Sequence, residues 1–243
     1  MSNSFFQFKQ FTIHQDRCAM KVTTDACLFG AWVAERLRSS EYGVRNILDI
    51  GTGTGLLSLM QAQKIKGNID AIEIDEAAAK QAIENIETSS WKEMVTIIND
   101  DVRNYSFPKK YNCIISNPPF YENELKSDNT KKNIAHHNEG LLLPELLSII
   151  KNNLEKDGIF YLLLPYKRNT EIKELLLQHE FALSQLMLVR QSVNHDYFRI
   201  MLSGKLKTNE SLETMIDEIS IKDENEQYTV EFTNLLKDYY LNL

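Results

Sequence analysis

Hydrophobic positions along the chain fall into short runs that alternate with helical patterns from residue 46 onward. Apolar runs of strand length cover residues 46–50, 69–74, 95–98, 111–115 and 159–164, and patterns typical of helices cover 56–64, 75–88, 141–154 and 168–179. Two later runs, at 181–189 and 198–202, have no clear helix between them. This order predicts an α/β fold with an open, mostly parallel sheet, helices on both faces and an antiparallel hairpin at one edge.

A length of 243 residues fits a single domain with a sizeable core. Within it, we expect residues 1–40 to form a helical or hairpin lid, residues 41–205 to form the sheet, and residues 206–243 to be a C-terminal addition. No apolar run approaches the roughly 18 residues that a spanning helix needs, and the first residues do not resemble a signal peptide. Cys18, Cys27 and Cys113 are too widely spaced for a metal site. We therefore expect a reduced, cytoplasmic protein, monomeric, with no bound metal and no membrane contact.

The net charge of -7 is concentrated in the C-terminal segment, because residues 208–243 hold nine acidic residues and two lysines. Residues 103–137, in contrast, carry six basic side chains against three acidic ones, and His136 and His137 close that stretch. A local basic patch is one interpretation, and two ordinary solvated loops are the other. The overall charge therefore does not exclude a nucleic-acid substrate.

A glycine-rich turn lies directly between the first predicted strand and the helix that follows it. It reads DIGTGTG, from Asp49 through Gly51 and Gly53 to Gly55. A dinucleotide fingerprint would need glycine where Leu56 stands. The spacing instead resembles the first motif of S-adenosylmethionine (SAM)-dependent methyltransferases, and it predicts a Rossmann-like, seven-stranded fold of that type. SAM carries an ammonium and a sulfonium group, so an acid such as Asp49 at the loop suits it electrostatically.

Acidic residues at the ends of the next two strands extend this prediction. Glu73 can accept both ribose hydroxyls of the cofactor. The carboxylate of Asp101 and the backbone N–H of Val102 suit the adenine ring, although Asp100 is an alternative for the same role. For Asp75 we favour a structural role as the N-cap of the following helix. These positions together predict SAM as the cofactor.

The tetrad Asn117-Pro118-Pro119-Phe120 follows the fourth predicted strand and indicates the chemistry. Two prolines stiffen the loop and remove donors, which leaves the Asn117 side-chain oxygen and the Pro118 carbonyl as acceptors. Acceptors on the hydrogens of a planar amine favour a more nucleophilic nitrogen and stabilise its developing positive charge. Phe120 can stack on the substrate. In-line attack on the methyl group then needs alignment but no strong general base.

The tetrad resembles the (N/D/S)PP(Y/F/W) motif of amino-methyltransferases. That class includes adenine-N6 enzymes acting on DNA or RNA, guanine-N2 enzymes acting on rRNA, and glutamine-N5 enzymes acting on release factors. The tetrad alone does not choose among them. A SAM-binding or RNA-binding module without activity is a further alternative, although both motifs are intact here.

The N-terminal segment carries a more specific resemblance. Residues 8–11 read FKQF, residues 18–25 read CAMKVTTD and residues 30–32 read GAW. Together they resemble the signature of the bacterial tRNA1(Val) adenine-N6 methyltransferases, whose pattern runs F-x-F-K-Q-F, C-A-M-K-V-x-T-D and G-A-W. The similarity continues through residues 198–202 to a closing stretch at 228–241 and thus covers nearly the whole chain. One departure is that the tetrad ends in Phe120 where the family has tyrosine.

This resemblance implies a tRNA partner that presents its anticodon loop, with methylation of the adenine at position 37, immediately 3′ of the anticodon. It also implies that Lys21 and Thr24 lie beside the methionyl end of SAM, with Lys21 near its carboxylate. The adenine must leave the loop stack to react. Basic residues after the tetrad, Lys126, Lys131, Lys132, His136 and His137, are candidates to bind the loop phosphates.

Overall fold

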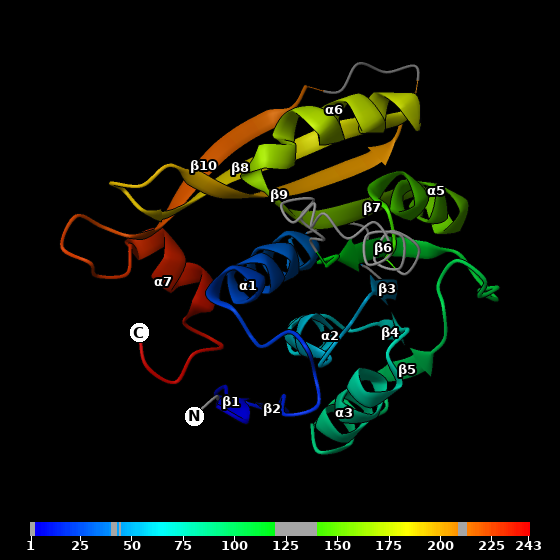
Figure 1. Cartoon of the computed structure of the whole chain (residues 1–243), viewed down its shortest axis with the longest axis horizontal. Coiled ribbons are helices and arrows are strands. Elements are labelled where there is room, and N and C mark those ends of the chain that lie inside the picture. The colour runs from blue at the N-terminus through cyan, green and yellow to red at the C-terminus, as the bar shows by residue number, and fades with distance from the viewer. Residues whose placement is uncertain (1–2, 40–42, 44, 120–139, 209–212) are drawn as a thin grey trace, which may run out of the picture.

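A computed structural model describes residues 3–39, 43, 45–119, 140–208 and 213–243. The fold has three layers, with helices on both faces of one large sheet (Figure 1). A separate two-stranded hairpin, β1 (Phe5–Gln7) with β2 (Thr12–His14), precedes it. The predicted α/β class and the helices on both faces are therefore confirmed.

The large sheet has eight strands in the order β10-β8-β9-β7-β6-β3-β4-β5. In chain order they are β3 (Asn46–Ile50), β4 (Asn68–Glu73), β5 (Val95–Asn99), β6 (Tyr111–Ser116), β7 (Leu154–Pro165), β8 (Phe181–Ser192), β9 (Tyr197–Leu206) and β10 (Met215–Lys222). β9 runs antiparallel to both of its neighbours, and all other pairs are parallel. The seven predicted strands and the antiparallel hairpin are confirmed, and β10 adds an eighth strand at the edge.

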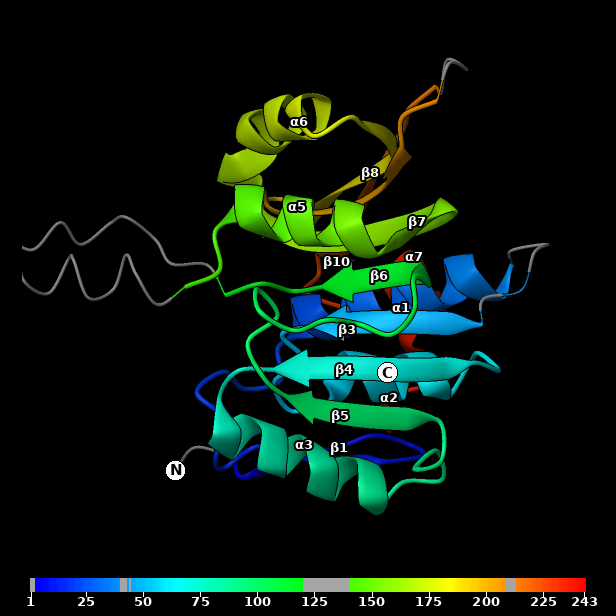
Figure 2. The same cartoon turned by 90° about the vertical axis from the view of Figure 1, so that its right-hand side faces the viewer.

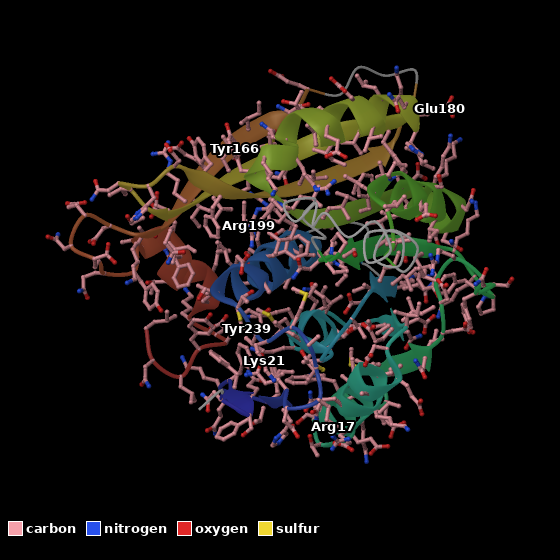
Figure 3. All side chains as sticks on the ribbon, viewed as in Figure 1. Arg17, Lys21, Tyr166, Glu180, Arg199 and Tyr239 are labelled. Carbon is pink, nitrogen blue, oxygen red and sulfur yellow. The ribbon has the colours of Figure 1, made fainter. Side chains whose placement is uncertain are left out.

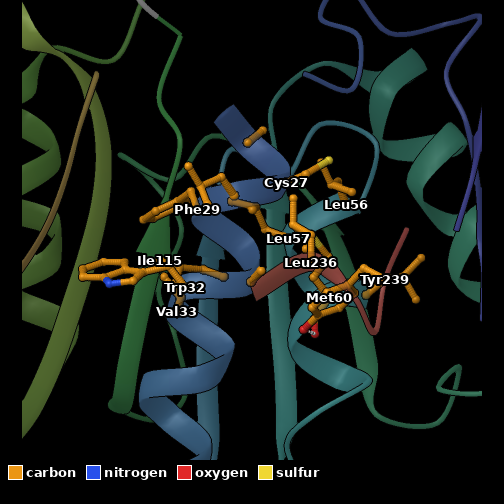
Figure 4. Packing of buried hydrophobic residues seen from close by; sticks show 14 of the residues in the cluster. Cys27, Phe29, Trp32, Val33, Leu56, Leu57, Met60, Ile115, Leu236 and Tyr239 are labelled. Atoms are coloured by element: carbon orange, nitrogen blue, oxygen red, sulfur yellow. Dashed lines mark hydrogen bonds between the residues drawn. The ribbon is translucent and has the colours of Figure 1, made fainter. Parts of the chain in front are cut away.

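Two sets of helices cover the sheet. On one face lie α1 (Thr24–Arg38), α2 (Leu56–Ala62), α3 (Glu76–Glu87) and α7 (Val230–Leu236). On the other face lie α5 (Leu143–Asn153), the 3-10 turn η1 (Tyr166–Arg168) and α6 (Asn169–Gln178). The core on the first of these faces joins segments from both ends of the chain, because one buried cluster includes Trp32 of α1, Leu57 and Met60 of α2, and Leu236 of α7 (Figure 4).

The terminal segments are tied to this core by backbone and side-chain contacts. Phe8 forms a bridge with Tyr240, and the Tyr239 hydroxyl donates to the Met60 carbonyl over 2.9 Å. Phe8, Phe29 and Trp32 are buried, so the segment 1–40 supplies core residues. Among the described helices, none is both long enough and apolar enough to cross a membrane.

The sheet topology determines where a ligand can bind. β4 and β6 lie on either side of β3, so the strand order reverses direction at β3. In sheets of this kind, a crevice for ligands lies beyond the carboxyl ends of the strands at such a point. Figure 2 shows the arrowheads of β4, β5 and β6 pointing to the same side. The glycine turn after β3, the acids after β4 and β5, and the tetrad after β6 therefore meet at one edge.

Candidate active site

A cavity of about 310 Å³ opens at this edge. Such a volume is at the lower end of what small-molecule sites enclose. Its lining includes seven residues that the sequence predicted for cofactor binding or chemistry, namely Gly51, Gly53, Glu73, Asp101, Val102, Asn117 and Pro118. It also includes Asp100, the alternative to Asp101, and Asp75. Four loops from separate parts of the chain thus converge on one space.

The glycine turn takes a backbone conformation that favours glycine. Gly51, Gly53 and Gly55 have φ values of 72°, 57° and 81°. A Cβ at Gly51 or Gly53 would meet no atom within 4 Å, whereas one at Gly55 would lie 3.5 Å from Ile86 of α3. The first two glycines therefore keep the turn open beside the cavity, and the third allows the turn to approach α3.

Glu73 supports the turn as well as lining the cavity. Its Oε2 accepts the Gly53 backbone N–H over 2.8 Å, and its Oε1 accepts the Asp75 N–H over 3.0 Å. Each carboxylate oxygen has a second lone pair, so the side chain can still accept from a bound ligand. The Asp75 carboxylate accepts the Ala78 N–H over 2.7 Å and caps α3, which confirms the structural role predicted for Asp75.

Asp49 lies beneath the turn and is completely buried. Its Oδ2 accepts hydrogen bonds from the Thr52 hydroxyl at 2.7 Å and the Ser58 hydroxyl at 2.8 Å. Its Oδ1 is buried and has no hydrogen-bond partner among the described residues. Burial raises the pKa of Asp49 to about 6, although the two hydroxyl hydrogen bonds oppose that rise. A buried carboxylate with a free oxygen is suited to a cationic ligand nearby.

The acids after β5 are held by local contacts. The Asp101 carboxylate accepts from the Arg103 Nε at 2.9 Å and from the Arg103 backbone N–H at 3.0 Å. The guanidinium of Arg103 holds the pKa of Asp101 below its usual range. Asp100 accepts the Asp101 N–H over 2.7 Å. Both carboxylates border the cavity.

The tetrad borders the same cavity at the end of β6. Ser116 anchors the strand end, because its hydroxyl donates to the Ile50 carbonyl over 2.8 Å. The next residue, Asn117, has a side-chain Oδ1 that is buried and lacks a hydrogen-bond partner in the described part of the chain. Buried polar groups are normally paired, so an unpaired acceptor at a cavity wall marks a place for a ligand donor. Phe120 and the basic candidates Lys126, Lys131, Lys132, His136 and His137 lie outside the described residues.

A family model described as "Methyltransferase small domain" matches residues 31–181. A tRNA1(Val) (adenine(37)-N6)-methyltransferase from Bacteroides thetaiotaomicron is 38% identical over 248 aligned residues, covering 100% of both chains. A protein of the same name from Cytophaga hutchinsonii is 38% identical, again over 100% of both chains. The chain belongs to the tRNA1(Val) (adenine(37)-N6)-methyltransferase family.

Solved structures similar to this family member share its fold at low sequence identity. A predicted O-methyltransferase from Agrobacterium tumefaciens has a TM-score of 0.67 at 16% identity and covers 90% of this chain and 100% of its own. A ribosomal protein L11 methylase from Lactobacillus delbrueckii has a TM-score of 0.57 at 16% identity, covering 81% of this chain and 84% of its own. These similarities confirm the methyltransferase fold.

The family signature near the N-terminus contributes to the cavity through residues for which the sequence predicted no binding role. Cys18, Ala19 and Met20 line it, whereas Lys21 and Thr24 are not among its lining residues. The Lys21 ammonium, labelled in Figure 3, donates instead to the Gln15 carbonyl. The buried Gln15 side chain accepts the Val22 N–H over 2.7 Å. The structure thus places the wall of the cavity immediately before Lys21.

Two buried amides on α3 hold this wall in place. Asn85 bonds both backbone groups of His14, at 2.9 Å each, and donates to the Thr54 carbonyl of the glycine turn, also at 2.9 Å. One turn earlier, Gln81 accepts the Arg17 N–H over 3.3 Å. Both amides are 1% exposed. Asn85 therefore connects the N-terminal wall to the glycine turn in this family member. Nothing local in the sequence marks it, because its partners lie far away in the chain.

We expect Asn85→Ala to weaken SAM binding about tenfold or more while kcat at saturating SAM changes little. Without the amide, the Thr54 carbonyl loses its buried hydrogen bond, at about 1–3 kcal/mol, and the two part-buried bonds to the His14 backbone are lost as well. Calorimetric titration with SAM and steady-state kinetics measure the two effects separately.

A matched control is Gln61→Ala, which removes another buried amide. Gln61 donates to the Gly30 carbonyl over 2.9 Å and joins α1 to α2 outside the cavity lining. Both variants should lower the melting temperature, but only Asn85→Ala should weaken SAM binding. Equal SAM affinity in the two variants would show that Asn85 contributes stability alone.

Proposed function

We propose that this protein transfers a methyl group from SAM to the N6 amine of adenine 37 in tRNA1(Val). The observation that carries the chemistry is the buried Oδ1 of Asn117 beside the cofactor cavity, which has no hydrogen-bond partner among the described residues. Membership of the family supports the choice of acceptor, since its full-length relatives carry that activity in their names. Guanine-N2 and glutamine-N5 enzymes, and a module without activity, are not favoured by these relatives.

The residues of the cavity fit the cofactor. Gly51 and Gly53 leave space beside the turn, Glu73 keeps lone pairs for the ribose hydroxyls, and Asp101 with Val102 borders the place for the adenine ring. The Oδ1 of Asp49, which no group in the described part of the chain pairs with, supplies negative charge beneath the turn. SAM, when bound, supplies an electrophilic methyl group. The chain provides the groups that hold it and the acceptors that face the incoming amine.

The tetrad prepares the amine for attack. The Asn117 Oδ1 and the Pro118 carbonyl accept the two N6 hydrogens, and each bond strengthens as positive charge develops on nitrogen. Pro118 is buried and the tetrad follows the anchored end of β6, so these acceptors are positioned before the substrate arrives. Phe120 stacks on the adenine. No side chain needs to remove a proton before methyl transfer. As the nitrogen–methyl bond forms, the sulfur–methyl bond breaks and the sulfur keeps the electron pair, and the cationic nitrogen then loses one proton to water.

The substrate reaches this site as an unstacked base of the anticodon loop. Lys126, Lys131, Lys132, His136 and His137 contribute to binding of the loop phosphates, and Lys21 and Thr24 contribute to binding of the methionyl end of SAM. The protein acts as a cytoplasmic monomer and needs no metal ion. The region 1–40 acts as a lid where residues 18–20 border the site, while its helix α1 belongs to the core, and the region 206–243 adds β10 and α7 to the catalytic sheet.

Methylation of purified tRNA tests this proposal. The wild-type protein, given SAM and tRNA from a strain without the native enzyme, should produce N6-methyladenosine, located by mass spectrometry at position 37 in a fragment of tRNA1(Val). A transcript with guanine at position 37 is the matched control and should remain unmethylated. Formation of N2-methylguanosine, or absence of new N6-methyladenosine, would contradict the assigned reaction.

A further inference from the structure

An exposed tyrosine lies at the same end of the sheet as the tetrad and is not among the residues that line the cofactor cavity. Tyr166 begins the η1 turn directly after Pro165, the last residue of β7, and β7 pairs with β6, which leads into the tetrad. A second hollow of about 210 Å³ is lined by Pro118, Pro119, Leu164 and Arg168. The η1 turn and the tetrad prolines therefore border the same hollow. Figure 3 labels Tyr166 near the N-terminal end of α6.

The ring of Tyr166 packs against the ring of Tyr197. Its centroid lies 5.3 Å from that of Tyr197, at an interplanar angle of 42°. The Arg190 guanidinium lies 4.3 Å from the Tyr197 ring centroid and donates to the Tyr197 hydroxyl over 2.6 Å. Both Arg190 and Tyr197 also contact the Glu218 carboxylate. Tyr197 is thus fixed by two partners, while Tyr166 is 36% exposed.

The charges around this ring are largely paired. Arg168 forms a salt bridge with Glu171 at 3.0 Å, and Arg199 forms one with Asp25 at 2.7 Å. The net charge of -7 gives the chain as a whole little general attraction to RNA, although that charge is concentrated in residues 208–243 and residues 103–137 carry an excess of basic side chains. An exposed aromatic ring that a neighbouring side chain holds in place, in contrast, can stack on an unpaired base of any type. This surface is therefore suited to a single-stranded base.

We propose that Tyr166 is a stacking platform for a base that flanks the target adenine in the anticodon loop. The inference rests on the proposed function, because it assumes that an RNA loop delivers its adenine to Asn117. Tyr197 and Arg190 act as positioning residues that hold the platform. The flanking base lies over the η1 turn while the target base enters beside the tetrad, so that one stacking contact fixes the register of the loop.

Binding of an unmodified tRNA1(Val) transcript tests the platform. Tyr166→Ala should raise both the Kd for the transcript and the KM for tRNA about tenfold, as expected for loss of one base–aromatic stack. Tyr166→Phe should retain most of the affinity, because it keeps the ring. The Kd for SAM should not change in either variant, which also shows that each variant is folded.

The matched control is Tyr228→Ala. Tyr228 is 42% exposed and stacks on Phe232 with centroids 4.6 Å apart, but it lies beside α7 and away from the tetrad. Its loss should leave tRNA affinity unchanged. Wild-type affinity in Tyr166→Ala, or an equal loss in Tyr166→Phe, would overturn the platform alone, provided that the wild-type protein methylates the transcript. An inactive wild-type protein would overturn the proposed function and the platform together.

Discussion

Replacement of Asn117 by alanine is expected to lower kcat by about 100- to 1,000-fold, the usual cost of losing one preorganised group that stabilises developing charge. The Kd for SAM should change by less than about threefold. The reason is that the Asn117 Oδ1, at the cavity wall, is an acceptor that no group in the described ranges pairs with, and the amine engages it most strongly as it becomes positive. Single-turnover kinetics and SAM titration measure the two quantities separately.

Two further variants make this experiment specific. Asn117→Asp should retain more activity than Asn117→Ala, because a carboxylate also accepts hydrogen bonds. Asn153→Ala is the control, since the Asn153 side chain donates only within α5, to the Ile149 carbonyl at 2.9 Å, and its loss should leave kcat unchanged. If Asn117→Ala lost SAM affinity and turnover equally, Asn117 would belong to the cofactor site instead.

The strands that the sequence predicted well are those buried on both faces. The run 46–50 coincides with β3, in which four of five residues are buried. β7 begins at Leu154, whereas the sequence predicted its start at residue 159. The first part of the strand contains Glu155, Lys156 and Asp157 and therefore has no apolar pattern. Edge strands are harder still to predict from the sequence. β10 pairs on one side only and buries Ile219 and Ile221 among acidic residues, so it was interpreted as part of an acidic addition.

The site residues also differ in how well the sequence predicted them. Gly51, Asp101 and Asn117 each follow a strand, and Glu73 is the last residue of one. Parallel strands bring their carboxyl ends together, so local motifs sufficed to predict that these residues converge. The wall formed by residues 18–20 depends on a tertiary contact: Asn85 bonds His14, 71 positions away. Family resemblance drew attention to Lys21, but a loop without regular periodicity does not reveal which of its side chains face the cavity.

Replacement of Asp49 by asparagine is expected to stabilise the cofactor-free protein above pH 7 and to weaken SAM binding strongly. Burial raises the pKa of this carboxylate from 3.8 to about 6, so its ionisation at neutral pH costs about 3 kcal/mol of folding free energy. Asparagine avoids that cost and still accepts from Thr52 and Ser58, although its new N–H group lacks a partner. We expect a net gain of about 1–2 kcal/mol, measured by chemical denaturation.

The pH dependence separates this explanation from a packing effect. Because the folded pKa of Asp49 is raised, its stabilising contribution is complete below about pH 4 and is lost as the pH rises through about 6. The advantage of Asp49→Asn should therefore appear between these values and level off above them. SAM affinity of the wild type should fall about tenfold for each pH unit below 6, because the cationic cofactor favours the ionised carboxylate. Asp49→Asn should lose that slope, whereas Glu76→Gln, which changes an exposed carboxylate on α3, should keep it. An Asp49→Asn protein that binds SAM as well as the wild type, with the same slope, would exclude Asp49 from cofactor binding.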